Sequence, residues 1–362
     1  MKVLSLFDGI SCARVALERA GFVVDKYYAS EIDKYAIEIA QKNYPDTIQV
    51  GSVVGLDSSQ FKDIELLIGG SPCQDLSIAK KNREGLSGQR SGLFYEYVRI
   101  LNEVKPKYFV LENVNSMPKE AKEQISEILG VQPTMINAAL VSAQNRKRLF
   151  WVGRLVGDKY EQVKIEQPED RGIFLKDILE NGESDRLKSH AIDASYYKGA
   201  SWKTYKEKSK RQLIKVGQLN SGGQGDRIYS QEGKSVSLSA NGGGRGAKTG
   251  LYAVARASVQ KNAEQYDDGK TPALTSAMGM GGGNVPMLME KETANKLKGK
   301  YIGDERQIIR KLTPIECERL QSLPDNYTEG VSNTQRYKAL GNAFNVDVVT
   351  HILKNMEEEC KT

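Results

Sequence analysis

Up to about Leu155 the sequence alternates short apolar runs with longer amphipathic runs, and this alternation constrains the fold more than any other feature. It is typical of a mostly parallel sheet covered by helices on both faces. The expected strands are Lys2–Leu6, Val23–Ala29, Ile64–Ile68, Lys107–Leu111, Thr134–Ala139 and Arg148–Val152, with a short strand near Ile48–Val50. The expected helices are Cys12–Ala20, Lys34–Lys42, Leu93–Val104 and Lys119–Leu129.

Three polar segments follow the carboxyl ends of predicted strands, where open α/β sheets bind their ligands. They are FDGISC after the first strand, SEID after the second and GGSPC after the strand at 64–68. A glycine-containing turn followed by an acid indicates a bound nucleotide or nucleoside, because Glu31 can accept hydrogen bonds from both ribose hydroxyls. These residues alone leave both NAD and S-adenosylmethionine open.

The middle of the chain, from Gly172 to about Gly303, is rich in Gly, Ser, Lys and Tyr and has few helix-length apolar periods. We interpret it as a second region of strands and loops. Residues 229–244 and 266–283 each combine a polar turn, an alternating run and a glycine cluster, which indicates two hairpins or a chance similarity of glycine-rich loops. Between 196 and 215, lysines interleave with aromatic rings, a mixture that suits a nucleic-acid surface or a solvated helix face.

Regular structure resumes in RKLTPIECERLQSLP, residues 310–324. Thr313 and Glu316 form the two halves of a capping box for a helix that begins at Pro314. A last helix follows LGNAFNVDVV and is expected to return to the first region.

Cysteine usage and hydropathy exclude several classes of protein. The four cysteines have no C-x-x-C spacing, so we expect free thiols, no disulfide framework and no metal site. Neither of the two histidines lies in a recognisable catalytic context, so acid–base chemistry is expected to use other groups. No apolar run approaches a membrane span, and Asp8 interrupts the N-terminal apolar run, which predicts a cytoplasmic protein.

Three motifs together suggest an enzyme family. GGSPCQDLSI (69–78), ENV (112–114) and QNRKR (144–148) resemble, in order and spacing, the signature motifs of the DNA (cytosine-5) methyltransferases. The first motif is particularly similar to the animal de novo enzymes, whereas the short N-terminus and the complete motif set resemble bacterial or phage enzymes. The similarity extends to GLF (92–94), to 310–324 and to ALGNAFNVDVV (339–349).

The resemblance implies a Rossmann-like class I methyltransferase sheet built from 1–171 and 304–362, with a smaller β- and loop-rich target recognition domain at 172–303. It also implies catalytic roles that fit the chemistry. A thiolate that adds to C6 of cytosine converts the ring into an enamine whose C5 can attack a methyl group, and Cys73 is the predicted thiolate. Glu112 is the acid expected to face N3 and the exocyclic amine. Arg148 resembles the arginine that contacts the cytosine carbonyl, and Arg146 its partner near the thiol and phosphate.

The same resemblance assigns a pocket for S-adenosylmethionine. The implied residues are Phe7, Gly9 and Ile10 for the methionine and adenosine, Glu31 for the ribose, Ile32 and Val53 for the adenine faces, and Pro72, Leu93, Asn342 and Ala343 for the remaining walls. Two positions depart from the family pattern. Ser11 replaces a glycine of the first motif, and Ser52 stands where an aspartate is expected to accept from the adenine amine.

Double-stranded DNA is the expected partner, and its target cytosine must be flipped out of the duplex to reach a thiol. Residues 74–91 are expected to close over the extruded nucleotide, with Gln74, Arg83 and Arg90 contacting DNA. In the middle region, Arg227, Asn241 and Arg245 are expected to reach base edges, and Lys208 and Lys210 to hold phosphates. The protein is expected to act as a monomer, without a membrane, and either in a restriction-modification system, whose endonuclease acts on the same site without stable binding, or as an orphan phage or prophage enzyme.

Three alternatives remain at this stage. An RNA-directed enzyme of the same architecture would have a small recognition region with a Cys-Phe-Thr signature, and this chain has neither. An inactive binding module would be expected to lack the cysteine, the glutamate or an arginine. An NAD enzyme would leave Cys73 and QNRKR without a role.

Overall fold

The chain divides into two compact units. The computed structural model describes residues 1–71, 92–198, 205, 212–218, 228–229, 251–252, 255–258, 261–265, 284–287, 301–302 and 307–358. The first unit comprises Met1–Ile178, Leu187–Lys198 and Thr313–Thr362, and the second comprises Leu179–Arg186 and Gly199–Leu312. These extents differ from the predicted regions at three places, of which the first is residues 172–178, which belong to the first unit. Residues 187–198 belong to the first unit because β10 (Ser189–His190) pairs with β7 (Gln144–Asn145), and 304–312 belong to the second because β18 (Gln307–Lys311) pairs with β11 (Leu213–Gln218).

An eight-stranded sheet forms the centre of the first unit, in the order β3-β2-β1-β4-β5-β8-β6, with β9 paired to β8. The pairs from β3 to β5 are parallel, whereas β8 runs antiparallel to β5, β6 and β9. The sheet is therefore mostly parallel, as the alternation predicts. Its strands are β1 (Lys2–Leu6), β2 (Lys26–Ser30), β3 (Ile48–Gln49), β4 (Leu66–Gly69), β5 (Tyr108–Val114), β6 (Pro133–Asn137), β8 (Lys147–Val156) and β9 (Lys159–Gln162).

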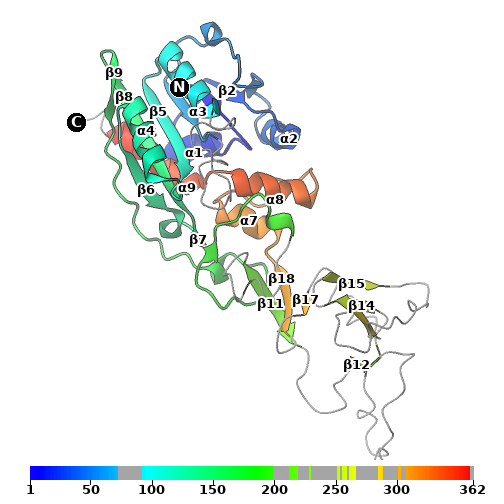
Figure 1. Cartoon of the computed structure of the whole chain (residues 1–362). Helices are drawn as coiled ribbons and strands as arrows, with labels where there is room; N and C mark the ends of the chain where they lie inside the picture. The colour runs from blue at the N-terminus through cyan, green and yellow to red at the C-terminus, as the bar shows by residue number, and fades with distance from the viewer. Residues whose placement is uncertain are drawn as a thin grey trace, which may run out of the picture. The chain divides into compact units, whose positions relative to one another are not determined.

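Helices cover both faces of this sheet, and Figure 1 shows α3 and α4 on one face and α1 and α9 on the other. Within the described residues, four short 3₁₀ helices lie in the connections: η1 (Ser58–Gln60), η3 (Ala138–Leu140), η4 (Leu175–Asp177) and η5 (Tyr196–Lys198). None of the helices that the structure describes combines the length and apolarity of a membrane span. The α-helices are α1 (Cys12–Ala20), α2 (Lys34–Asn43), α3 (Gly92–Val104), α4 (Lys119–Leu129), α7 (Pro314–Leu320), α8 (Asn333–Asn342) and α9 (Val346–Glu358).

The predicted boundaries of β1, α1 and α4 are confirmed, but the prediction for β2 is wrong at its start. This strand begins at Lys26 rather than Val23. The N-terminal ammonium donates to the Val23 carbonyl at 2.6 Å, and the Asp25 amide donates to the Met1 carbonyl at 2.9 Å. Residues 22–25 therefore connect the helix to the strand, because their backbone groups bond to the chain terminus.

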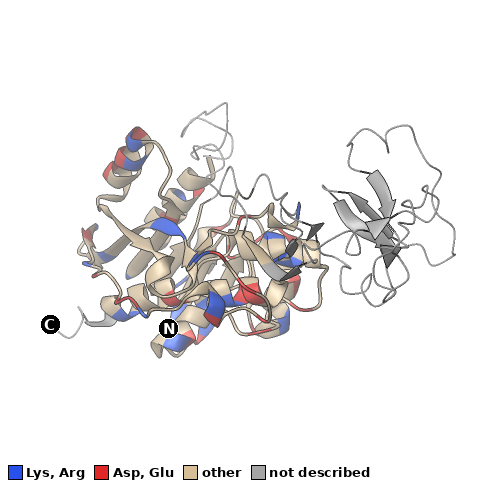
Figure 2. Cartoon of the chain, turned by 90° about the horizontal axis from the view of Figure 1, so that it is seen from below, with Lys and Arg blue, Asp and Glu red and all other residues tan. Residues whose placement is uncertain are grey.

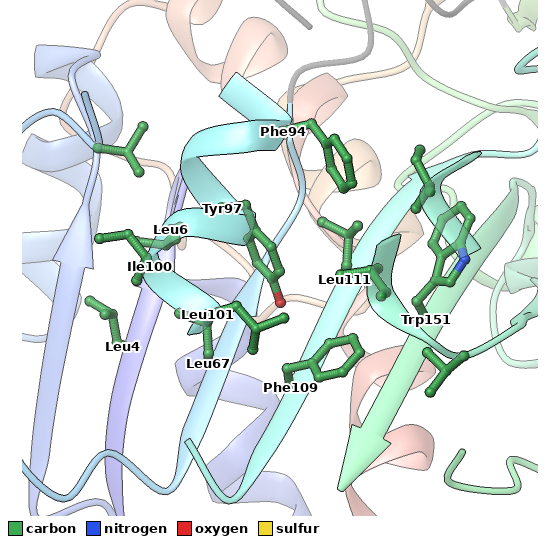
Figure 3. Packing of buried hydrophobic residues seen from close by; sticks show 14 of the residues in the cluster. Leu4, Leu6, Leu67, Phe94, Tyr97, Ile100, Leu101, Phe109, Leu111 and Trp151 are labelled. Atoms are coloured by element: carbon green, nitrogen blue, oxygen red, sulfur yellow. The ribbon is translucent and has the colours of Figure 1, made fainter. Parts of the chain in front are cut away.

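The main core lies between the large sheet and the helices α3 and α4, which cover one of its faces. In Figure 3, Tyr97 and Phe94 of α3 pack toward Phe109 and Leu111 of β5, with Trp151 of β8 nearby. The Tyr97 hydroxyl donates to the Val110 carbonyl at 3.1 Å, so the buried phenol is satisfied. This packing fixes the strands whose ends carry the candidate site.

The C-terminal segment contains two helices where the sequence predicted one last helix after 339–349. α8 ends at Asn342 and α9 begins at Val346, so the motif contains the break between them. α9 packs against α1, where Thr350 Oγ1 donates to the Ala16 carbonyl at 3.4 Å, and thus returns to the first unit as expected. The predicted capping box is confirmed, because the Glu316 amide donates to Thr313 Oγ1 at 3.1 Å and the Thr313 amide to Glu316 Oε2 at 2.8 Å.

Short strands make up the described part of the second unit. β11 and β17 (Tyr301–Ile302) flank β18 in one antiparallel sheet. A second sheet has the order β15-β14-β16, and β12 pairs with β13. The two predicted hairpins at 229–244 and 266–283 lie almost wholly outside the described residues. The remaining bounds are β12 (Ile228–Tyr229), β13 (Leu251–Tyr252), β14 (Ala255–Ser258), β15 (Lys261–Gln265) and β16 (Asn284–Met287).

Candidate active site

A cavity of about 460 Å³ lies at the carboxyl ends of β1, β2, β4 and β5 in the first unit. This is where the sequence predicted a ligand site, and the volume lies in the usual range of small-molecule sites, about 300–1,000 Å³. The lining includes residues after β1, after β2 and after β4, residues 191–194, and one side of α8. Among the predicted residues it contains Phe7, Gly9, Glu31, Ile32, Val53, Leu93, Glu112, Arg146, Arg148 and Asn342.

The turn after β1 is held in an unusual backbone conformation. Phe7, Gly9 and Ser11 have φ of 57°, 62° and 58°, the left-handed region that favours glycine. Ser11 therefore adopts the conformation of the glycine it replaces, and its hydroxyl donates to Asp8 Oδ2 at 2.6 Å. Burial raises the pKa of the Asp8 carboxyl, which also accepts from Tyr27. Non-glycine residues at such φ cost of order 1–3 kcal/mol and cluster at ligand sites, which supports a binding role for this turn.

The Glu31 carboxylate is fixed by backbone donors. Its Oε2 accepts from the Gly9 amide at 2.9 Å, and its Oε1 accepts from the amides of Ile32 and Asp33 at 2.7 and 2.8 Å. The side chain thus ties the turn after β1 to the end of β2. A carboxylate oxygen has further lone pairs, so both oxygens keep the capacity to accept from a diol in the cavity.

The cavity wall beside Glu31 is apolar but partly open. Val53 is buried, whereas Ile32 is 78% exposed, and Leu93 lines the same cavity. Ser52 also lines it, and its Oγ accepts from the Val54 amide at 3.1 Å. This bond occupies an acceptor site and leaves the hydroxyl hydrogen of Ser52 for another partner.

Two predicted cofactor residues lie beside the cavity rather than in its lining. The Ile10 side chain is buried in the core, and its carbonyl accepts from the Tyr327 hydroxyl at 2.8 Å. Ala343 is also buried, and its carbonyl accepts from Arg146 at 2.9 Å. Both residues therefore support the lining, whereas their neighbours Gly9 and Asn342 form it.

Glu112 and Arg148 form an ion pair at the end of β5. Arg148 Nε lies 2.8 Å from Glu112 Oε1, and the two side chains are only 20% and 16% exposed. The antiparallel register of β5 and β8 brings them together. It pairs Arg148 with Val114, and Glu112 lies two residues before Val114, on the same face of the sheet. Gly70 makes room for the carboxylate, since a Cβ there would lie 2.9 Å from Glu112 Oε2. The pair therefore presents one fixed carboxylate oxygen beside the end of β4.

Arg146 has a different environment from Arg148. Its guanidinium is buried and donates to the backbone carbonyls of Ile192 at 2.9 Å, Gly341 at 3.1 Å and Ala343 at 2.9 Å. These contacts join the segment after β10 to the end of α8.

The family described as C-5 cytosine-specific DNA methylase matches residues 1–358. The chain belongs to this family. It is accordingly a DNA (cytosine-5) methyltransferase, which agrees with the resemblance seen in the sequence motifs.

Individual relatives cover nearly the whole methylase. It is 28% identical to the orphan methyltransferase M.SPRI of Bacillus phage SPR, over 98% of this chain and 97% of that protein. It is also 28% identical to the type II methyltransferase M.HhaI of Haemophilus parahaemolyticus, over 98% of this chain and 94% of that protein. The solved Entamoeba histolytica methyltransferase EhMeth has a similar fold, with a TM-score of 0.57, 17% identity and coverage of 100% and 99% of the two chains.

Several residues predicted for the methylase lie outside the part of the chain that the structure describes. Cys73 and Pro72 are among them, although Ser71, which immediately precedes them, lines the cavity. The other predicted residues of this kind are Gln74, Arg83, Arg90, Lys208, Lys210, Arg227, Asn241 and Arg245. Their roles stay predictions.

The cavity also contains residues that sequence reasoning missed. Lys338 of α8 forms an ion pair with Asp33 at 2.5 Å, and both line the cavity. Residues 191–194 line it too, although they belong to none of the motifs. The helical spacing of Lys338 and Asn342 could have indicated a shared face of α8. For residues 191–194 the sequence gives no local signal.

Proposed function

We propose that this methylase binds S-adenosylmethionine in the cavity and transfers the methyl group to a flipped cytosine held between Cys73 and Glu112. The observation that carries the proposal is the pair of fixed carboxylates in one cavity. Glu31 follows β2 and Glu112 lies on β5, and the sheet order β2-β1-β4-β5 separates them by three strand spacings. At about 4.8 Å per spacing this is about 14 Å, which leaves room for a nucleoside at one end and a base at the other.

The residues present fit the cofactor. The Glu31 carboxylate suits two ribose hydroxyls, and Val53 and Leu93 offer apolar surface to a purine. When bound, S-adenosylmethionine supplies an electrophilic methyl group on a sulfonium. Among the described residues no cluster of His, Cys, Asp and Glu is arranged to hold a metal ion.

Each proposed catalytic residue has one task. The Cys73 thiolate adds to C6 of cytosine, and the resulting enamine carbon C5 takes the methyl group as its bond to sulfur breaks. Glu112 hydrogen-bonds N3 and the exocyclic amine through its two carboxyl oxygens, since Oε1, which Arg148 contacts, keeps a further lone pair. Arg148 also contacts the cytosine carbonyl. A water or hydroxide then takes the C5 proton, the Cys73–C6 bond breaks, and the free thiolate is regenerated.

DNA recognition is assigned to the second unit, with the predicted target recognition domain at 172–303. The support is that residues 199–312 form a compact unit separate from the large sheet, with their own small sheets. A separate unit can change its DNA site without changing the catalytic residues. The proposed state is a monomer. The relatives include both orphan and type II methyltransferases, so a restriction partner acting on the same site is compatible with the family.

Covalent trapping tests the proposed nucleophile. DNA with 5-fluorocytosine at the target position should become linked to the protein, because fluorine cannot leave C5 as a proton does. Cys73→Ser should abolish the linkage, whereas the buried thiols of Cys12 and Cys317 should remain unmodified. Burial raises the pKa of the Cys12 thiol and so disfavours its thiolate. Trapping that persists in Cys73→Ser, or maps to another cysteine, would refute the assignment.

A further inference from the structure

Residues 191–194 form a wall of the cavity, and we refer to them as the 191–194 wall. They follow β10 and precede η5, and all of them line the cavity. The chain enters the second unit at Gly199, five residues beyond Ala194. No sequence motif covers the wall, so its position depends on contacts with the rest of the first unit.

Two buried side chains hold the wall on the side of β7. The Ile192 amide donates to Gln144 Oε1 at 3.1 Å, and the Ile192 carbonyl accepts from Arg146 Nη1 at 2.9 Å. Gln144 and Arg146 are 0% and 5% exposed. Side chains from β7 and the residue after it therefore satisfy both backbone polar groups of Ile192 and extend the pairing of β10 with β7.

A glycine sets the distance of the wall from α8. A Cβ on Gly341 would lie 2.2 Å from the Asp193 carbonyl carbon, 2.4 Å from its oxygen and 2.3 Å from the Ala194 nitrogen. All three atoms belong to the backbone, so no rotamer change can relieve the overlap. Arg146 completes the junction, since its Nη2 donates to the carbonyls of Gly341 and Ala343. One guanidinium thus bonds to the wall and to the end of α8, both of which lie at the cavity.

We propose that the 191–194 wall is part of the cofactor-binding site and that Arg146 is a positioning residue, which sets the gap between this wall and α8. The inference rests on the proposed binding of S-adenosylmethionine in the cavity. It assigns Arg146 to shaping the cofactor site, in addition to the contact near the thiol and phosphate that the family resemblance implies. Gly341 and Ile192 are the other residues on which the gap depends.

Gly341→Ala is the sharpest variant because the backbone of α8 suits alanine at this position. Gly341 lies within the helix and is not among the residues with positive φ, so alanine should favour the helix itself. Any loss of binding then comes from a wider gap between the wall and the end of α8, because the overlap is with backbone atoms of the wall. Thr334→Ala is the matched control, since Thr334 is exposed on the same helix and the change also raises helix propensity.

The measurements are the Kd of S-adenosylhomocysteine for the full chain by calorimetry, the KM for S-adenosylmethionine, kcat, and the thermal melting temperature. We expect Gly341→Ala to raise Kd and KM at least tenfold with kcat at saturation within threefold, and Thr334→Ala to stay within twofold throughout. Arg146→Lys should raise Kd in the same way, because one ammonium cannot bridge Ile192 to both α8 carbonyls. A general folding defect would instead lower the active fraction and kcat without changing KM.

Two outcomes separate this inference from the proposed function. If the wild-type chain does not bind S-adenosylhomocysteine, the proposed cofactor site itself is refuted. If the wild type binds and a folded Gly341→Ala variant binds equally well, the wall is not part of the site. Should Gly341→Ala fail to fold, Arg146→Lys decides, because it weakens the bonds that hold the wall and the end of α8 without adding an atom between them; unchanged affinity in that folded variant overturns the inference.

Discussion

The two units of the methylase differ in how their strands are built. In the first unit, strands of up to ten residues, such as β8, form one eight-stranded sheet whose central strands are buried. In the described part of the second unit, strands of two to six residues form separate sheets of two or three strands. A large buried sheet holds groups at its strand ends to within the tolerance that catalysis requires, whereas small sheets mainly carry loops.

This difference suggests a division of labour between chemistry and DNA reading. The described residues proposed for the chemistry, Glu112 and Arg148, lie in the first unit on β5 and β8. In Figure 2 the positions of basic and acidic residues alternate along the ribbon of that unit's helices and loops. Of the basic stretch at 196–215, residues 199–215 belong to the second unit. Changes in the first unit should therefore leave the choice of DNA site intact, and changes in the second unit should leave cofactor binding and catalysis intact.

The largest effect is expected at Glu112. Glu112→Gln keeps the shape of the side chain but removes the acid and the ion pair with Arg148. A general acid contributes about 10²–10⁴-fold, so kcat should fall by about that factor while the Kd of S-adenosylhomocysteine stays within about threefold. Single-turnover methylation of DNA measures the first quantity and calorimetry the second.

Glu120→Gln is the control, since Glu120 is an exposed glutamate in the first turn of α4. It should have wild-type activity. If Glu112→Gln were as active as the wild type, Glu112 would not be the catalytic acid, and the chemistry would not depend on the end of β5.

The next effect concerns the other end of the cavity. Glu31→Ala removes a carboxylate that holds the turn after β1, so S-adenosylmethionine should bind more weakly by about 1.5–3 kcal/mol. Ser52→Ala should cost about 1 kcal/mol or less, because it removes one neutral hydroxyl. Calorimetric titration compares the two. Equal losses would instead make Ser52 a full partner of the adenine.

The third effect tests the second unit through a residue outside the described part of the chain. Arg245→Ala should relax the choice of methylation site, since an arginine that reads a guanine contributes about 1–3 kcal/mol of discrimination. Sequencing of methylated cytosines in DNA treated with the variant measures this. Cofactor affinity should not change. If exchanging 172–303 for the same region of a related enzyme leaves the methylated sequence unchanged, site choice resides in the first unit.

The sequence predicts the sheet and its strand-end residues well because both depend on local patterns. The alternation of apolar and amphipathic runs predicts β1. The predicted glycine turn and the predicted acid lie together, because the Gly9 amide donates to Glu31 Oε2 at 2.9 Å. The 191–194 wall was missed because its place depends on Gly341, about 150 residues later, and on the missing Cβ there. The backbone contacts of Arg146 were hidden for the same reason, since its acceptors are carbonyls that no side-chain pattern marks.

The smallest effect is expected from lysines of the second unit, and it separates the affinity for DNA from the choice of DNA site. The paired change Lys208→Ala and Lys210→Ala, in the basic stretch, should weaken DNA binding at all sequences alike, because phosphate contacts carry no sequence information. Each lost contact lowers the slope of log K against log salt by about 0.9, so the slope should fall by up to about two. Fluorescence anisotropy titrations between low and moderate salt, on target and non-target duplexes, measure both quantities.

The control is the paired change Lys119→Ala and Lys122→Ala on α4. It removes the same charge from the first unit and should leave the slope unchanged. A slope that falls equally in both pairs would show that DNA responds to the net charge of the protein, and the basic stretch would then have no special contact with phosphate.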